Sequence, residues 1–250
     1  MPRRSTPARA AAPAFLTLVT GTWINVAAIL AGTLVGTLVG SRLPAGLQQR
    51  VMAGLGLVTL VLGVDNALEW HRTNPIIVFG GVLLGGLVGE LIGIERLLGR
   101  LGDAAQRRFS SGPHSRVSEG FVTTSLLFCV GPLAVIGSIQ DGLTGNYDTL
   151  ASKAMLDGFA AIAFASTLGW GVGLSAISVL LYQAVLTLGA GMFEGILAEG
   201  SEALAALVSA GGILIIGISL KLLGLKDVRV GNFLPALVFA PALVGLVSIF

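Results

Sequence analysis

The chain has 250 residues, of which 54% are hydrophobic and 11% are charged, with a net charge of +2 and a mean hydropathy of +0.89. Soluble domains carry about 25% charged residues. This composition therefore excludes a water-soluble fold and makes the lipid bilayer the main partner of the surface. The small net charge gives no reason to expect a nucleic-acid partner, and a single cysteine excludes a disulfide framework.

Residues 1–17 carry three arginines, three prolines and no acid, which predicts a disordered basic lead. Residues 18–250 form one polytopic membrane domain. Its apolar runs are long enough to cross about 30 Å of hydrocarbon, and they predict an all-α integral membrane protein with seven to eight transmembrane helices. The runs cover residues 18–40, 51–70, 75–98, 121–139, 152–172, 174–197, 203–223 and 232–250.

Residues 99–120 form the one long polar stretch between these runs and predict a cytoplasmic loop. Basic residues collect in cytoplasmic loops, and this stretch holds Arg100, Arg107, Arg108 and Arg116. The turns expected on the other side carry mostly acids. This bias places the N-terminus outside, although the basic lead opposes that orientation.

Glycine recurs every four residues in two of the runs, at residues 32, 36 and 40 and at residues 81, 85, 89 and 93. Such stripes let transmembrane helices approach closely. Residues 27–40 resemble 160–173, residues 80–89 resemble 211–220, and residues 126–139 resemble 237–249. This order suggests two four-helix halves with the same orientation, unless the likeness only reflects shared Gly, Ala and Leu content.

The stretch from residue 121 to residue 173 is apolar but interrupted. Pro132 removes a backbone donor in mid-span and leaves the carbonyl four residues earlier without its helical bond. The simpler interpretation of Gly131-Pro132 is a kink. We favour a broken helix near Gly131-Pro132 that faces a polar cavity, because Gly137, Gln140 and Asp141 follow closely.

Two charges lie on one helical face inside this stretch, Lys153 and Asp157 at i and i+4. A charge at the centre of the bilayer costs about 2.5 kcal/mol or more. The pair is either a structural ion pair that locks a hairpin or a site where Asp157 exchanges a cation or proton. We take the second interpretation as the lead and place the path between the fourth and fifth runs, where Glu90, Gln140 and Asp141 would assist in binding the substrate or ion.

Other polar residues within the runs are weaker candidates for a substrate or ion site. Glu90 is a snorkelling carboxylate or a second acidic ligand, and Asn25 and Asn232 are helix caps or substrate donors. Ser166 and Thr167 bond to their own helix or line a cavity. No metal site is expected, because neither histidine has a partner at ligand spacing. No cofactor or enzyme motif is present, although an intramembrane enzyme is a remote alternative.

Six segments of the chain form a recognisable set. They are GTWINVAAILAG, the Gly89-Glu90 pair, LFCVGPLAVIGSIQDGLTG, LxxKAMLDG, FASTLGWGV and NFLPAL. Together they resemble the YqgA/YdfK-like family of bacterial inner-membrane proteins, domain-of-unknown-function family 554. The resemblance covers residues 21–250 and is most specific at residues 126–173. It implies a multi-pass protein of the bacterial inner membrane and implies no particular activity.

The sequence thus predicts a secondary transporter or channel for a small solute or cation, with Asp157 as the coupling acid. Acids without a His or Cys cluster favour protons or hard cations. The alternative is a structural or assembly protein, in which the glycine stripes mark the faces of a homo-oligomer.

Overall fold

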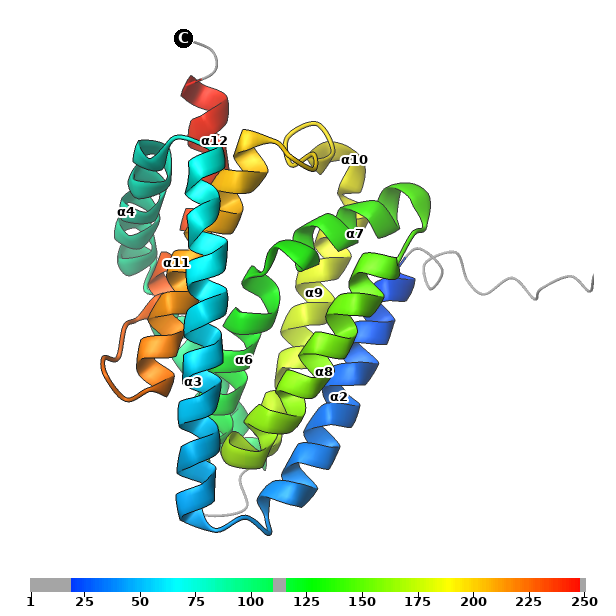
Figure 1. Cartoon of the computed structure of the whole chain (residues 1–250), viewed down its shortest axis with the longest axis vertical. Coiled ribbons are helices and arrows are strands. Elements are labelled where there is room, and N and C mark those ends of the chain that lie inside the picture. The colour runs from blue at the N-terminus through cyan, green and yellow to red at the C-terminus, as the bar shows by residue number, and fades with distance from the viewer. Residues whose placement is uncertain (1–18, 110–115, 248–250) are drawn as a thin grey trace, which may run out of the picture.

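The computed structural model describes residues 19–109 and 116–247, and within those ranges every regular element is a helix. The predicted all-α membrane fold is confirmed (Figure 1). The predicted disordered lead, residues 1–17, lies outside the described residues. In chain order the helices are α2 (Thr20–Gly40), α3 (Ala45–Ala67), η1 (Leu68–Arg72), α4 (Pro75–Ile92), α5 (Ile94–Phe109), α6 (Val117–Val130), α7 (Pro132–Thr144), α8 (Asp148–Leu168), η2 (Gly169–Leu174), α9 (Ser175–Leu188), α10 (Ala190–Phe193), α11 (Glu202–Leu222), η3 (Val230–Phe233) and α12 (Ala236–Val247).

Six helical stretches in the described ranges are long and apolar enough to cross a membrane, or seven when α6 and α7 count as one bent span. One of the six, Asp148–Leu188, has 41 residues, which is about 60 Å of helix and twice the hydrocarbon thickness. It contains η2, where the chain reverses direction (Figure 1). The structure thus gives six or seven candidate spans, and the predicted count of seven to eight, with a separate crossing by the 14 residues of α9, stays a prediction.

The first glycine stripe packs α2 against α8. A Cβ on Gly32, Gly36 or Gly40 would lie 2.2–2.3 Å from a backbone carbonyl oxygen of α8, closer than real Cβ atoms come. Gly32 meets Gly158 and Gly40 meets Ser166, so the two helices run parallel. Because α2 and α8 open the two proposed halves, their parallel direction agrees with the suggested repeat, which itself stays a prediction.

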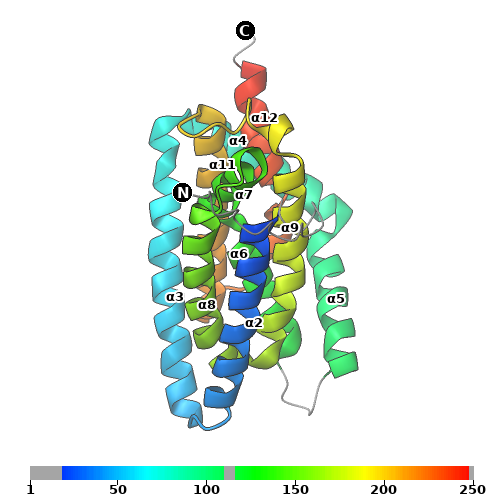
Figure 2. The same ribbon diagram turned by 90° about the vertical axis from the view of Figure 1, so that its right-hand side faces the viewer.

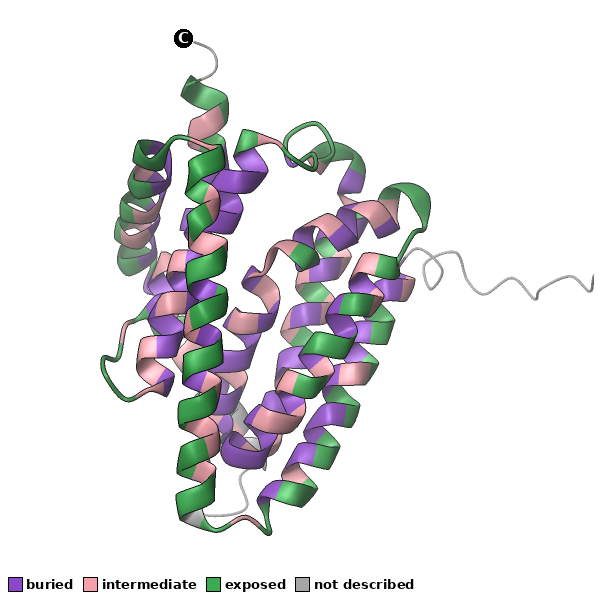
Figure 3. Ribbon diagram, viewed as in Figure 1, coloured by how far each residue is buried: buried purple, intermediate pink, exposed green. Residues whose placement is uncertain are grey.

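The second stripe packs α4 antiparallel against α12 and η3, with Gly81 on Ala240 and Gly89 on Asn232. In the same way α3 lies antiparallel to α11, where Gly63 meets Ile216. Both stripes are therefore covered within the chain, and a homo-oligomer would need another face. The outward sides of α3 and α4 are largely exposed (Figure 3), as expected of helices that face lipid.

The prediction of a loop over residues 99–120 is wrong at both ends, because residues 99–109 belong to α5 and residues 117–120 to α6. Gly93 takes a left-handed φ of +75° and ends α4, so the third predicted span stops at Ile92 and not at residue 98. Helix α5 then runs along the side of the bundle (Figure 2). This helix is strongly amphipathic, with one apolar face and one charged face. Its sequence therefore contains no continuous apolar run, and a search for such runs does not find it.

The predicted break at Gly131-Pro132 is present. Gly131 adopts an extended conformation, with φ −72° and ψ 150°, between α6 and α7, and Pro132 opens α7 at its first position. The two helices meet at a bend of 62°. The N–H of Ala134 donates to the carbonyl of Gly131 at 3.1 Å, whereas a continuous helix would direct it to Val130. The break therefore frees backbone carbonyls in the interior of the bundle.

The two ends of the bundle differ in charge, and we call them the basic end and the acidic end. The basic end holds the α2–α3 turn, η2, the start of α6 and the end of α11, at the bottom of Figure 1. The acidic end holds η1, the α7–α8 turn and the loop before α11. Their charged residues are Arg42, Arg116, Glu119 and Lys221 at the basic end, and Glu69, Arg72, Asp148, Glu194, Glu199 and Glu202 at the acidic end.

Candidate functional site

Lys153 and Asp157 form the predicted ion pair on α8, and the pair is closed. Lys153 is 4% exposed and Asp157 is 8% exposed. The ammonium group donates to Asp157 Oδ2, and the same oxygen accepts a hydrogen bond of 3.0 Å from Asn25 Nδ2 on α2. Asn25 therefore binds a neighbouring helix instead of capping its own. Both charges are neutralised within the core.

The far side of Lys153 meets α6. Its ammonium group lies 5.9 Å from the centre of the Phe128 ring, within the range of a cation–π contact. Cys129 follows Phe128 and packs near the same pair. The pair thus joins α2, α6 and α8 just before the helix break. Two polar cavities, described below, open at the ends of the bundle, and Asp157 lines neither of them. The geometry therefore favours a structural ion pair over a site at which Asp157 exchanges a cation or proton.

Asp141 is the buried acid whose charge is not paired. It lies in the last turn of α7 and is 1% exposed. Its Oδ2 accepts a hydrogen bond of 3.1 Å from the N–H of Gly21, so it caps the start of α2 from another helix. Its Oδ1 has no partner, and no cationic group of the described residues lies within ion-pair distance.

Further unpaired polar atoms lie on the helix that carries this acid and on the two helices packed against it. Helices α2, α7 and α9 pack against one another, and their parts near the acidic end carry most of the described buried side-chain atoms without a hydrogen-bond partner. Gln183 is 0% exposed and lacks a partner at both its amide atoms. The other atoms are Thr22 Oγ1, Asn25 Oδ1, Ser138 Oγ, Asp141 Oδ1 and Thr187 Oγ1.

Three of the other candidates make local bonds. Gln140 accepts a hydrogen bond of 2.7 Å from the hydroxyl of Thr149 and so ties α7 to the start of α8. Ser166 and Thr167 donate to carbonyls three residues earlier, at 2.8 and 3.0 Å. These bonds satisfy their hydroxyl donors within α8 itself. Gly137 fits against Leu150, where a Cβ would lie 2.9 Å from that side chain.

Glu90 and Asn232 come together at the junction of α4 and α5. Asn232 donates to the exposed Glu90 and accepts a hydrogen bond of 2.7 Å from the N–H of Glu95. Asn232 therefore caps the start of α5 and not its own helix. Arg229 lies 3.7 Å from Glu90. This group holds η3 to α5 and lies apart from Asp141, on the α4–α12 side of the fold.

A polar cavity of about 270 Å³ opens at the acidic end beside the helix break. Pro132 and Ile136 of α7 form one wall, and α3, η1 and α11 form the others. Arg72 and Glu69 form an ion pair of 3.4 Å in this lining. The charged and amide residues of the lining are Asp65, Asn66, Glu69, Arg72 and Glu199.

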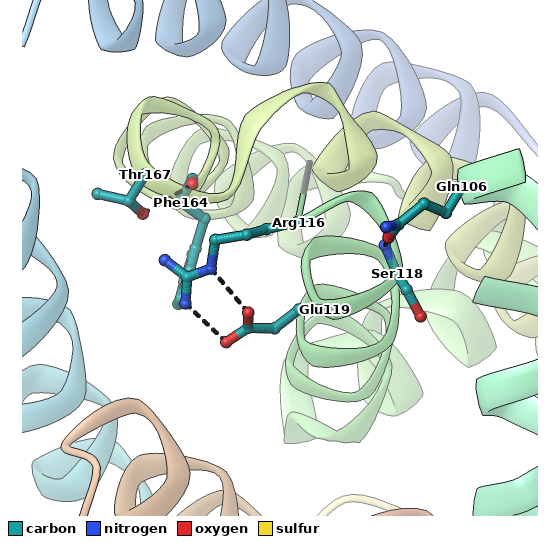
Figure 4. A network of polar contacts seen from close by, with 6 residues as sticks. All are labelled: Gln106, Arg116, Ser118, Glu119, Phe164 and Thr167. Carbon is teal, nitrogen blue, oxygen red and sulfur yellow. Dashed lines mark hydrogen bonds and ion pairs between the residues drawn. The ribbon is translucent and has the colours of Figure 1, made fainter. Parts of the chain in front are cut away.

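A second polar cavity, of about 500 Å³, lies at the basic end between α5, α6 and α11. Arg116 binds Glu119 through two hydrogen bonds of 2.8 Å (Figure 4). Gln106 accepts a hydrogen bond of 3.2 Å from the N–H of Ser118, which ties α5 to the start of α6. Lys221 of α11 also lines this cavity. The lining is therefore rich in charges of both signs.

The two cavities lie at opposite ends of α11. Val208 near the start of α11 lines the first, and Lys221 at its end lines the second. A separate pocket of about 10 Å³, which shares Glu95, Val122 and Lys221 with the second cavity, reaches Leu126 and Ile218. Val208 and Ile218 are ten residues apart, so about 15 Å of α11 separates the hollows.

An apolar barrier fills that interval. Val130, Ala210 and Leu214 are at most 2% exposed. A Cβ on Gly211 would lie 2.8 Å from Val130 Cγ1 and 3.0 Å from the Val130 carbonyl oxygen, so α6 and α11 touch here without a gap. The carbonyl freed by the helix break thus faces the barrier. Ser209, fully buried and without a hydrogen-bond partner for its hydroxyl, adds a polar side chain to this interval of α11.

Sequence reasoning missed Gln183 and the lining of both cavities. Gln183 lies in an apolar run on α9, where a lone glutamine carries no charge signal. Asp65, Glu69 and Arg72 lie at the end of a predicted span, and only the pairing of α3 with α11 brings them to the helix break. Within residues 19–109 and 116–247, no three His, Cys, Asp or Glu side chains lie together as a multi-ligand metal site would require.

The fold and these sites define a helical integral membrane protein with a broken span and a buried polar core. The chain belongs to the family described as "Protein of unknown function (DUF554)", whose model matches residues 20–245. It is 30% identical over 233 residues to the uncharacterized membrane protein YdfK of Bacillus subtilis (strain 168), covering 92% of this chain and 97% of that protein. It is also 30% identical over 228 residues to the uncharacterized protein YqgA of Escherichia coli (strain K12), covering 89% and 95%. No solved structure matches the fold.

Proposed function

We propose that the protein transports a small hydrophilic solute or ion across the bacterial inner membrane, along the α6–α7 and α11 interface. The observation that carries this proposal is the pair of polar cavities at opposite ends of α11, separated by one apolar barrier at the helix break. Transporters commonly build their pathway around broken helices, because the freed carbonyls must face protein or water and not lipid.

The proposed pathway differs from the one expected from sequence. The sequence placed the path between the fourth and fifth runs, which are α6–α7 and α8. The cavities instead flank α6–α7 on its other side, against α11. In this proposal the Lys153–Asp157 pair lies on the opposite side of α6 from the pathway. It fixes the position of α6 through the contact of Lys153 with Phe128, and it is itself held by the hydrogen bond from Asn25.

The charge bias of the two ends supports an orientation. Basic residues favour the cytoplasmic side, which places the α2–α3 turn and the larger cavity inside the cell. The acidic end, with Glu69 and Glu199 in its cavity, then faces outward. This is the orientation expected from the loop charges of the sequence.

Flux into proteoliposomes tests the proposal, with a panel of cations, amino acids and organic acids. Ala205 lines the acidic-end cavity, and Ala205→Trp should fill that cavity and abolish the flux of the transported solute. The matched control is Leu57→Trp on the exposed side of α3, which should leave flux unchanged. No flux of any solute on the panel, or equal flux in Ala205→Trp and the control, would contradict the proposal.

The alternative of a structural or assembly protein loses its main support, because both glycine stripes are covered within the chain. The remaining small-residue surface is a shallow apolar groove on the outer side of α2 and α8, lined by Ala28, Gly32 and Gly158. That surface faces the expected lipid and carries no polar group that would select a partner.

A further inference from the structure

We propose that the protein binds one sodium ion among α2, α7 and α9, with the Asp141 carboxylate as its charged ligand and Gln183 as a neutral one. This inference rests on the proposed transport function and deepens it by naming the coupling ion. It is a statement about binding, so it can be tested without any transported solute.

The first argument is charge. The negative charge of Asp157 is neutralised by Lys153, but Asp141 has no cationic partner among the described residues. An unpaired charge in a protein interior is strongly destabilising. The start of α2, which Asp141 caps, supplies about half of an elementary positive charge. About half of an elementary negative charge is left on the pair of groups, so a monovalent cation leaves a smaller positive excess than a divalent one.

The second argument is the set of unpaired atoms. Buried polar groups nearly always have a partner in native structures, yet Gln183 is 0% exposed with neither amide atom bonded. The hydroxyls of Thr22, Ser138 and Thr187 are unpaired on the same three helices. Carboxylate, amide and hydroxyl oxygens are the ligands that hard cations prefer. The amide N–H₂ of Gln183 is free to hold a water beside the ion.

The third argument is size. Gly142, which follows Asp141, packs so closely on α9 that a Cβ there would lie 2.1 Å from the carbonyl oxygen of Thr187. The helices that carry the ligands therefore cannot separate without losing this contact. Helices held this closely leave less room for a large ion than for a small one, so we propose sodium and not potassium as the ion.

The test is thermal stability of the purified full-length protein, with Tm measured in sodium, potassium or choline chloride at one ionic strength. A ligand that binds only the folded protein raises its stability. At 100 times its Kd, sodium should raise Tm by about 5–10 °C relative to choline. Binding of ²²Na⁺ should saturate at one ion per chain.

Asp141→Asn is the informative variant, because asparagine caps a helix as well as aspartate does. It should fold and lose both the sodium-dependent rise in Tm and the ²²Na⁺ binding. Gln183→Leu should bind sodium at least tenfold more weakly. Thr37→Val is the control, since Thr37 also has an unpaired buried hydroxyl but lies further along α2; it should bind normally.

Several results would overturn the inference. These are equal Tm values in all three salts, a Tm that responds to pH alone, and full sodium dependence in Asp141→Asn. Sodium binding without flux of any solute on the panel would contradict only the transport proposal. Solute flux without sodium binding would contradict only the sodium site.

Discussion

The Lys153–Asp157 pair offers a direct measure of what holds the bundle together beside the break. Replacing Asp157 by Asn leaves the Lys153 ammonium group 4% exposed without its counter-charge. Removing one partner of a buried pair costs about 3–5 kcal/mol. At about 2–4 °C per kcal/mol for a chain of this size, Tm should fall by roughly 6–20 °C. Thermal unfolding of the detergent-purified protein measures this change.

The double variant Lys153→Met/Asp157→Leu separates charge imbalance from lost packing. Apolar replacement of a whole buried pair is often neutral or stabilising. The Asn25 amide would still lose its acceptor, which costs about 1–3 kcal/mol. The double variant should therefore be more stable than Asp157→Asn. The exposed Arg116–Glu119 pair is the control, and Glu119→Gln should cost at most about 1 kcal/mol. A double variant no more stable than the single one would refute the reasoning.

Three further predictions concern the helix packing, the helix break and the cap that Asn232 provides for α5. Gly36→Val should disrupt the α2–α8 contact and lower Tm by several degrees, whereas Gly54→Val on the open side of α3 should not. Pro132→Ala should restore a backbone donor, reduce the bend and lower proteoliposome flux while the protein still folds. Asn232→Ala should cost about 1–2 kcal/mol by removing the cap of α5, measured as a fall in Tm.

The sequence predicted those features that depend on local chemistry. A proline in mid-span kinks or breaks a helix, so the place of the interruption was visible at Pro132. The glycine stripes indicated close packing, because glycine every fourth residue lies on one face. Lys153 and Asp157 are four residues apart, and helical geometry alone brings them together.

The features that depend on tertiary pairing could not be predicted. The lack of a cationic partner for Asp141 depends on which helices pack against the end of α7, and no local pattern shows that. Asn232 caps a helix more than a hundred residues earlier in the chain. The cavities arise from the antiparallel pairing of α3 with α11, which no local pattern fixes. Helix α5 was hidden because its apolar residues recur with helical period between charges.

Two-sided labelling of single cysteines tests the proposed pathway most directly. In a Cys129→Ala background, cysteines replace Ala205 in the acidic-end cavity, Ser118 in the basic-end cavity and Ser209 in the barrier. We predict that a membrane-impermeant thiol reagent added outside right-side-out vesicles labels position 205 and not position 118. Inside-out vesicles should reverse the result, and position 209 should react only while solute is being transported. Labelling of 205 and 118 from the same side, or of neither from any side, would contradict a pathway along α6–α7 and α11.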